Sequence, residues 1–203
     1  MKGRSVVGIG AGGHAKVVIE ILHLMGGYDL VGLLDADPAL WGSEVLGVPV
    51  LGDDMLLSEI YDQGVRNAFI GVGTVKCSEP RRALYEQVRQ TGFETVAALH
   101  PRAIISPTAK IGDGPTIMAG AVINPNASVG DNVIINTGAI VEHDCMIGNH
   151  VHVATGARLA GSIKIGDGAH IGIGATIREG IRVGRGSIVG AGAVVVSDVP
   201  EFV

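Results

Sequence analysis

Aromatic side chains are scarce in this chain of 203 residues, where Phe, Trp and Tyr together make up 3%. Hydrophobic residues still make up 47%, so the core must consist of small and branched aliphatic side chains. Cys77 and Cys145 are too few for a disulfide framework. The apolar stretches are much shorter than a membrane span, and no leader of sufficient length opens the chain. These absences predict a cytoplasmic protein that does not use a membrane.

Basic clusters are missing as well. Lys and Arg number 15 against 20 Asp and Glu, which gives a net charge of -5, and the basic residues are scattered along the chain. Binding of nucleic acid requires a basic patch or stripe, so nucleic acid is not an expected partner. The length of 203 residues allows one large domain or two modest ones.

The second half of the chain has an unbroken period of six residues. Val, Ile or Leu occupies every sixth position from Leu99 to Val195, and the residue two positions earlier is usually small. A period of six fits neither an α-helix nor an ordinary strand and indicates a repeating coil. A β-sandwich would instead show alternation and irregular turns.

Glycine recurs every eighteen residues within this repeat, so three sides of six residues make one turn of the coil. Glycine is expected at one corner because the turn needs either a positive φ or a close approach of two backbones. The pattern predicts a left-handed parallel β-helix over 98–203, with about five coils stacked about 4.8 Å apart. The glycine column is Gly112, Gly130, Gly148, Gly166 and Gly184.

Residues 1–97 lack the period of six and alternate between predicted strands and helices. Such alternation favours a small parallel sheet covered by helices, here a Rossmann-like half domain. The predicted strands are 5–9, 28–34 and 68–72, and the predicted helices are 15–25, 55–61 and 80–90.

A glycine-rich turn follows the first predicted strand. Gly8, Gly10 and Gly13 match the dinucleotide fingerprint, and Asp35 follows at the end of the second strand, where an acid that binds ribose would lie. A complete NAD fold needs roughly 150 residues, so a ligand with one base and one diphosphate suits this half-sized domain better. The alternative for the glycines is a turn that only joins the strand to the helix. The alternative for Asp35 and Asp37 is a solvated turn without a ligand. The candidate substrate-binding residues are Gly10, Gly12, Gly13, His14, Lys16, Asp35 and Asp37.

The repeat also assigns positions to the histidines. His143 lies two residues after Val141 and therefore at an outward corner of the coil. Eighteen residues later, in the same column of the next coil, lies Gly161. Because glycine has no side chain, it leaves space and an approachable amide beside the imidazole. His152 lies half a revolution away, with Asn136 near its column. Within one chain the two imidazoles point apart, so a site that uses both needs two chains and favours a trimer.

The run Glu-His-Asp-Cys-Met-Ile-Gly at 142–148, with Asn136 before it and His152 and Gly161 after it, resembles the bacterial hexapeptide-repeat nucleotide-sugar N-acetyltransferases. Members of this family act on 4-amino-4,6-dideoxyhexoses, and sialic acid O-acetyltransferases are related to them. The resemblance extends from the glycine turn to the last coil. It implies acetyl-CoA as co-substrate, no metal, a homotrimer with active sites between chains, and GDP-perosamine or a UDP-linked amino sugar as acceptor.

The resemblance also implies roles for single residues. His143 would be the catalytic base beside Asp144, and the glycine turn, the two acids and Asn136 would bind the nucleotide sugar. Family members commonly end in a Gly-x-Pro-Ala-Lys segment near the CoA adenine, which is not present before Val203. Either the adenine contacts differ, or that tail is missing from the chain as given. The implied contacts of acetyl-CoA are His152, Gly161, Ile173, Gly190 and Gly192.

Direct transfer is the expected mechanism. The base removes a proton from the sugar ammonium, and the amine attacks the thioester, whose oxyanion is stabilised by the Gly161 amide and by His152. Cys145 occupies a small inner corner and is interpreted as packing, not as a nucleophile. Two other classes remain open: a γ-type carbonic anhydrase with zinc on His143, His150 and His152, and a non-catalytic scaffold or nucleotide-sugar sensor.

Overall fold

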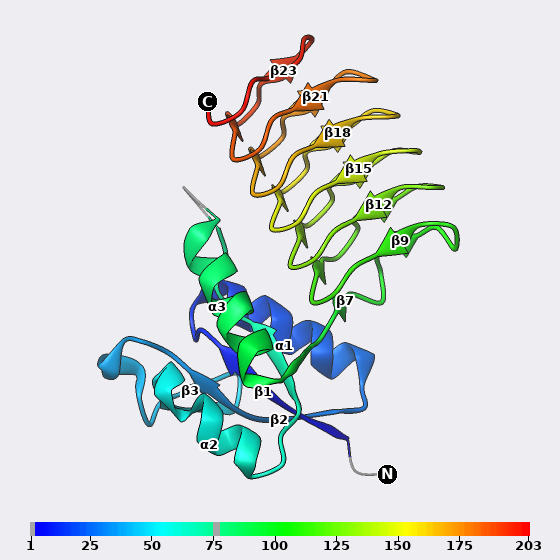
Figure 1. The fold of residues 1–203 in the computed structure, drawn as a ribbon. Helices are drawn as coiled ribbons and strands as arrows, with labels where there is room; N and C mark the ends of the chain where they lie inside the picture. Colours follow the sequence, from blue (N-terminus) through cyan, green and yellow to red (C-terminus); the bar gives the residue numbers. More distant parts are fainter. Residues whose placement is uncertain (1–2, 75–77) are drawn as a thin grey trace. The chain divides into compact units, whose positions relative to one another are not determined.

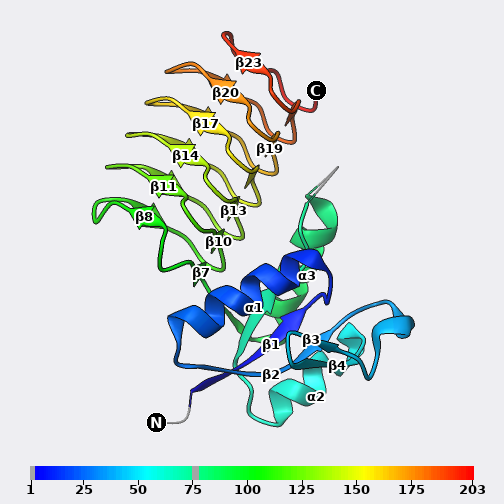
Figure 2. The same ribbon diagram turned by 180° about the vertical axis from the view of Figure 1, so that it is seen from behind.

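The computed structural model describes residues 3–74 and 78–203, so Cys77 lies outside the described residues. The chain divides into unit 1 (Met1–Gly73 and Pro80–Ala98) and unit 2 (Thr74–Glu79 and Leu99–Val203). Figures 1 and 2 show the two units from opposite sides. Each unit has a hydrophobic core of its own. No helix in the described part of the chain is long and apolar enough to cross a membrane.

Unit 1 is a six-stranded sheet with the order β3-β4-β2-β1-β5-β6. Helices α2 and α3 pack their apolar side chains into one core against the sheet, and α1 covers the other face (Figures 1 and 2). The helices are α1 (Gly13–Met25), α2 (Leu57–Asp62) and α3 (Glu79–Thr91), and the strands are β1 (Arg4–Ile9), β2 (Tyr28–Leu34), β3 (Glu44–Val45), β4 (Val48–Gly52), β5 (Asn67–Ile70) and β6 (Glu94–Thr95).

The predicted strands and helices of unit 1 are present, but the sheet is not wholly parallel. Strands β3 and β4 form an antiparallel hairpin at one edge. Its two-residue loop, Leu46 and Gly47, has φ angles of 50° and 79°, as in the tight turns that match the twist of a hairpin. Leucine is an unusual residue for such a turn, so the sequence carried little signal for it.

Unit 2 is a left-handed parallel β-helix with three flat faces, as predicted. Each face stacks strands that are eighteen residues apart and pair in parallel. Face 1 contains β7 (Ala98–Leu99), β10 (Thr116–Ile117), β13 (Ile134–Ile135), β16 (His152–Val153), β19 (His170–Ile171) and β22 (Ile188–Val189). Face 2 contains β8 (Ile104–Ile105), β11 (Val122–Ile123), β14 (Ile140–Val141), β17 (Arg158–Leu159), β20 (Thr176–Ile177) and β23 (Val194–Val195). Face 3 contains β9 (Lys110–Ile111), β12 (Ser128–Val129), β15 (Met146–Ile147), β18 (Lys164–Ile165) and β21 (Arg182–Val183).

The second residue of each two-residue strand points into the prism and the first points outward. The inward aliphatic side chains form one continuous core together with the small residues at the inner corners, such as Ala139 and Ala157. Cys145 occupies one of these corners and is fully buried. Each six-residue side of the coil places one aliphatic side chain in the core, and this requirement explains the period of six.

Close packing, not a left-handed backbone, explains the glycine column. A Cβ atom on Gly130 would lie 2.9 Å from the carbonyl carbon of Gly148 in the next coil. The left-handed corners come two residues later, at every sixth position from Gly114 to Gly192. Most of these positions are glycine, and the others are Asn126, Asn132, Asp144, His150 and Ser162, mainly residue types that tolerate this conformation.

Candidate functional site

His143 and Asp144 form a bonded pair at the corner between β14 and β15. Asp144 takes one of the left-handed positions, with φ of 60°. This turn brings the two adjacent side chains together, so that Nδ1 of His143 lies 2.8 Å from Oδ2 of Asp144. Both side chains are exposed, His143 by 59% and Asp144 by 51%. The pair is therefore accessible to a substrate.

The hydrogen bond fixes the state of the imidazole. A carboxylate only accepts, so Nδ1 of His143 carries the proton and Nε2 carries the lone pair. The hydrogen bond to Asp144 raises the pKa of His143, with smaller contributions from the charges of Asp144, Glu142 and Glu179. The same bond, helped by Asn126, lowers the pKa of Asp144. Nε2 is thus an outward-facing base that becomes active once His143 loses its second proton.

Gly161 lies in the same column one coil later, as predicted, and it lies directly against the ring. A Cβ atom there would be 2.6 Å from Cε1 and 2.7 Å from Nε2 of His143. Any side chain would therefore displace the imidazole. In the described part of the chain the Gly161 N–H donates to no acceptor, whereas the next residue, Ser162, donates to the carbonyl of His143. The imidazole and an available amide hydrogen lie side by side.

A second polar group lies on face 1 around His152. Oδ1 of Asn136 accepts from the N–H of Thr137 at 2.7 Å, so its Nδ2 faces His152 and donates to Nε2 at 3.2 Å. Nδ1 of His152 donates to the carbonyl of Thr74 at 2.9 Å. The ring of His170, one coil on, stands edge-on at 4.8 Å. Asn136 and Thr74 thus hold His152 as a neutral imidazole in one tautomer.

The remaining predicted contacts of acetyl-CoA lie on the corner between faces 1 and 2. The N–H of Gly192 donates to the carbonyl of Ile173 at 2.8 Å. The Ile173 side chain is 62% exposed, and Gly190 and Gly192 have open space where a side chain would be. His143 and Gly161 lie instead on the corner between faces 2 and 3, so one chain presents the predicted residues in two groups.

The glycine turn of unit 1 has two tight positions and two open ones. A Cβ on Gly8 would collide with Phe69, and Gly10 has φ of 101° and lies against Val72. Gly12 and Gly13, at the start of α1, have nothing within 4 Å of such an atom. Both residues are exposed, and backbone amides at the start of a helix can bind a phosphate.

Asp35 and Asp37 shape the loops beside this turn. The carboxylate of Asp35 accepts from the N–H of Ala11 at 2.7 Å and from that of Asp37 at 2.9 Å. Asp37 accepts from the N–H of Ala39 at 3.0 Å, which caps a short helical turn. Asp35 and Gly10 also line a small cavity of about 120 Å³. Lys16 is exposed on the first turn of α1.

Arg81 is a residue that the sequence analysis missed. Its side chain on α3 is 2% exposed and donates to the carbonyls of Ile70 and Val72, and it also lies 3.3 Å from Nε2 of His14. Burial lowers the pKa of Arg81 to about 9. The guanidinium thus fixes the end of β5 and the candidate residue His14. Arg81 differs from its exposed neighbour Arg82 only in being buried, and the sequence does not indicate which of the two arginines is buried.

The other histidines and Cys145 do not gather into a site. Nδ1 of His150 lies 3.0 Å from Nδ2 of Asn132, and His152 is held on face 1. Within residues 3–74 and 78–203, no group of three His, Cys, Asp or Glu side chains is close enough to hold a metal ion. Burial raises the pKa of the Cys145 thiol, which disfavours the nucleophilic thiolate.

Comparison with known protein families gives matches over both units. The family described as the PglD N-terminal domain matches residues 5–88. The family described as bacterial transferase hexapeptide (six repeats) matches residues 108–142, 127–161 and 162–197. A search of curated proteins gave no match.

Several solved structures are similar along nearly the whole chain. A variant of perosamine N-acetyltransferase from Caulobacter crescentus, with a histidine replaced by asparagine and in complex with CoA and GDP-perosamine, is 43% identical, with 98% of this chain and 91% of that chain covered and a TM-score of 0.93. The acetyltransferase domain of PglB from Neisseria gonorrhoeae is 38% identical, with 97% and 93% covered and a TM-score of 0.89. WeeI from Acinetobacter baumannii is 28% identical, with 98% and 95% covered and a TM-score of 0.78.

Proposed function

Because the chain belongs to the PglD-like hexapeptide-repeat sugar N-acetyltransferases, we propose that it acetylates the 4-amino group of a nucleotide-linked 4-amino-4,6-dideoxyhexose with acetyl-CoA. GDP-perosamine is the proposed acceptor, since the perosamine N-acetyltransferase that is 43% identical was crystallised with it. The observation that carries the proposal is the His143–Asp144 pair against Gly161, a base next to an available amide.

His143 acts as the general base in this proposal. The sugar amine is largely an ammonium near neutral pH and cannot attack until it loses a proton. Nε2 of His143 takes that proton, while the bond from Nδ1 to Asp144 stabilises the imidazolium that forms. The amine nitrogen then forms a bond to the thioester carbon and gives up its second proton. The carbon–sulfur bond breaks, and the sulfur takes up that proton, so that CoA leaves as the thiol.

The Gly161 N–H is the proposed donor to the oxyanion of the tetrahedral intermediate. It lies beside the base and has no acceptor among the described residues. An amide held by the rigid coil needs no rearrangement as negative charge develops on the oxygen. His152 has both ring nitrogens engaged by Asn136 and Thr74, so in this arrangement it contributes a contact surface for the thioester end and not a further N–H.

The nucleotide half of the acceptor is assigned to unit 1. Exposed amides at Gly12 and Gly13, the N-terminus of α1 and the ammonium of Lys16 suit a diphosphate. His14, Asp35 and Asp37 border the same turn. In this proposal these residues form the half-sized pocket for one base and one diphosphate that the sequence favours.

A homotrimer with sites between chains is part of the proposal. The imidazole of His143 lies on the corner between faces 2 and 3, whereas His152 lies on face 1 of the same coil region. A small thioester group cannot touch both in one chain. A cyclic trimer that places His143 of one chain against His152 of the next has three equivalent sites, and each site contains both residues.

An assay of CoA release tests the proposed function. The purified protein is mixed with acetyl-CoA and GDP-perosamine, a UDP-linked 4-amino sugar, or sialic acid, and the released thiol and the product mass are measured. We expect release with GDP-perosamine and a product heavier by one acetyl group. No release with either nucleotide amino sugar would overturn the proposal, and an O-acetylated sialic acid would replace it with the related activity.

Replacement of the base gives a sharper result. His143→Asn should lower kcat by roughly 100-fold or more, because general base catalysis contributes about that much. The matched control is His23→Asn, at an exposed position in the last turn of α1, which should keep normal turnover. Near-normal turnover of the His143→Asn variant would exclude the role assigned to His143.

A further inference from the structure

Glu179 follows His143 and Gly161 in one column of the coil, with eighteen residues between successive members. The N–H of Ser162 donates to the carbonyl of His143 at 2.9 Å, and the N–H of Gly180 donates to that of Gly161 at 3.0 Å. The three coils are therefore in register at this corner. Each member of the column is followed by a left-handed residue, namely Asp144, Ser162 or Gly180. The side chains of His143 and Glu179 thus leave the corner in the same direction.

The imidazole of His143 lies level with Gly161, one coil nearer to Glu179 than its own backbone. A Cβ atom on Gly161 would be 2.7 Å from Nε2 of His143, so the ring extends along the axis toward Glu179. The backbone of Glu179 is one further coil away, about 5 Å at normal strand spacing. Gly161 places no side chain between the two. One ammonium group can contact both Nε2 and the carboxylate of Glu179, because its hydrogen bonds to such acceptors are about 2.8 Å long.

The charge of Glu179 acts on the candidate base. The hydrogen bond from Asp144 is the main cause that raises the pKa of His143, and the charges of Glu142 and Glu179 raise it further. The guanidinium of Arg178 does not offset this effect. The Glu179 carboxylate is exposed, and within residues 3–74 and 78–203 it takes part in no hydrogen bond or ion pair. By itself it makes the imidazole keep its second proton to higher pH, which is a disadvantage for a base.

An amine acceptor changes the effect of this carboxylate. The amine arrives as an ammonium and passes a proton to Nε2 of His143. The positive charge thereby moves from the substrate to the imidazole, but it stays beside Glu179. The carboxylate therefore stabilises the charge before and after the transfer and does not oppose the step. A hydroxyl acceptor brings no positive charge, and an acceptor with a carboxylate of its own, such as sialic acid, would be repelled.

We propose that Glu179 binds the ammonium of the acceptor sugar beside His143 and makes the enzyme select an amine over a hydroxyl. The inference rests on the proposed function and names a residue that decides between N-acetylation and O-acetylation within it. An ion pair at such an exposed position should contribute roughly a fivefold preference for the amine.

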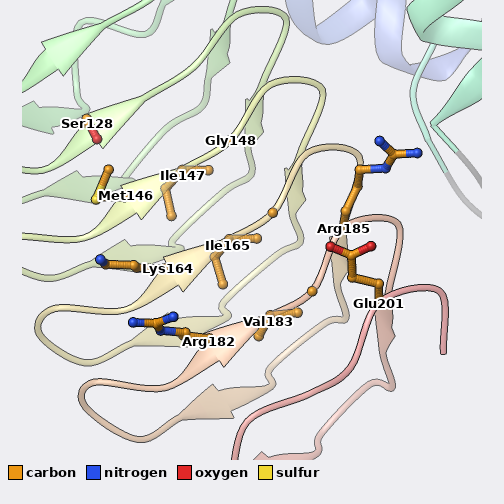
Figure 3. Close-up of a pocket in the computed structure, with 12 residues that line it drawn as sticks. Ser128, Met146, Ile147, Gly148, Lys164, Ile165, Arg182, Val183, Arg185 and Glu201 are labelled. Carbon is orange, nitrogen blue, oxygen red and sulfur yellow. The ribbon is translucent and has the colours of Figure 1, made fainter.

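Calorimetry compares Glu179→Gln, which keeps the size of the side chain and removes its charge, with the matched control Glu201→Gln. Glu201 is exposed and lies beside Arg185 at a groove of face 3 whose described lining includes neither His143 nor Glu179 (Figure 3). The two ligands are GDP-perosamine and GDP-6-deoxymannose, which carries a hydroxyl in place of the amine. We expect wild type and the control to bind the amine about fivefold more tightly, and Glu179→Gln to bind both equally.

Titration of the His143 ring by NMR needs no sugar and separates the inference from the proposed function. The pKa of His143 should be lower in Glu179→Gln than in wild type and unchanged in Glu201→Gln. An unchanged pKa in Glu179→Gln, or an amine preference that survives the substitution, would overturn the inference and leave the proposed function standing. A lowered pKa without binding of either nucleotide sugar would contradict the proposed acceptor and, with it, the inference.

Discussion

At the scale of single residues, backbone conformation creates the candidate base. Asp144 occupies a left-handed corner that the preceding and following coils fill with Asn126 and Ser162. An aspartate tolerates this conformation better than most side chains, and the turn directs its carboxylate back to the preceding imidazole. Gly161 contributes by lacking a side chain where His143 lies. The left-handed turn therefore lets the side chains of His143 and Asp144 bond to each other, whereas in a strand or helix the side chains of adjacent residues would point apart.

The pH dependence of turnover should reveal this pair. The hydrogen bond to Asp144 raises the pKa of His143, so wild-type kcat should increase with pH as the imidazolium deprotonates. In Asp144→Asn the carboxylate is lost, the pKa of His143 falls toward its ordinary value, and the acidic limb of the kcat profile should move to lower pH while the maximum decreases.

Asparagine is chosen for this test because it accepts a left-handed φ, so the corner is retained. The matched control is Asp167→Asn, which keeps the side-chain oxygen that accepts from the N–H of Asn149 at another corner. Profiles of kcat against pH are compared for the three proteins. An acidic limb at the same pH in wild type and Asp144→Asn would contradict the role of Asp144.

At the scale of elements, the coil uses glycine for two different physical reasons. Gly130 belongs to the column in which neighbouring backbones approach closely, and Gly138 belongs to the column of left-handed corners with open space around it. The sequence shows the first column clearly, because it repeats every eighteen residues. It obscures the second column, because Asn, Asp, His and Ser replace glycine at some of its corners.

Two alanine substitutions separate these reasons. In Gly130→Ala the new methyl group would lie 2.5 Å from Oδ1 of Asn149 and 2.9 Å from its amide nitrogen, so a loss of about 3 kcal/mol or more in unfolding free energy is expected. In Gly138→Ala only the φ of 67° is unfavourable, and the loss should be about 1 kcal/mol. Urea unfolding followed by circular dichroism gives both values, and equal losses would show that the two columns do not differ.

At the scale of the whole molecule, the three-sided coil separates the candidate residues. His143, Asp144 and Gly161 lie at the corner between faces 2 and 3. His152 lies on face 1, where Asn136 bonds to it from the end of β13. The proposed trimer accounts for this separation, since the corner of one chain and the face of the next can form one site.

Mixed trimers test the shared site. His143→Asn and His152→Ala proteins carrying different tags are co-expressed, and the mixed species is purified through both tags. Each parent should be nearly inactive. In a mixed trimer of either composition, one of the three sites receives an intact His143 from one chain and an intact His152 from the next, so activity should return to about a third of the wild-type value. No recovery, or full activity of the His152→Ala parent, would contradict sites shared between chains.

The sequence by itself determined the β-helix, because an inward aliphatic side chain is required on every side of every coil and leaves a strict period of six. It likewise determined the alternating elements of unit 1 and the position of His143 above Gly161, because a fixed repeat assigns each residue a side and a height. The hairpin of β3 and β4 was not determined, since Leu46 gives no turn signal. Only the tertiary structure decided the pairing of Asp144 with His143, the tautomer of His152 and the burial of Arg81. These depend on φ angles, side-chain directions and solvent exclusion, which the pattern of residue types does not encode.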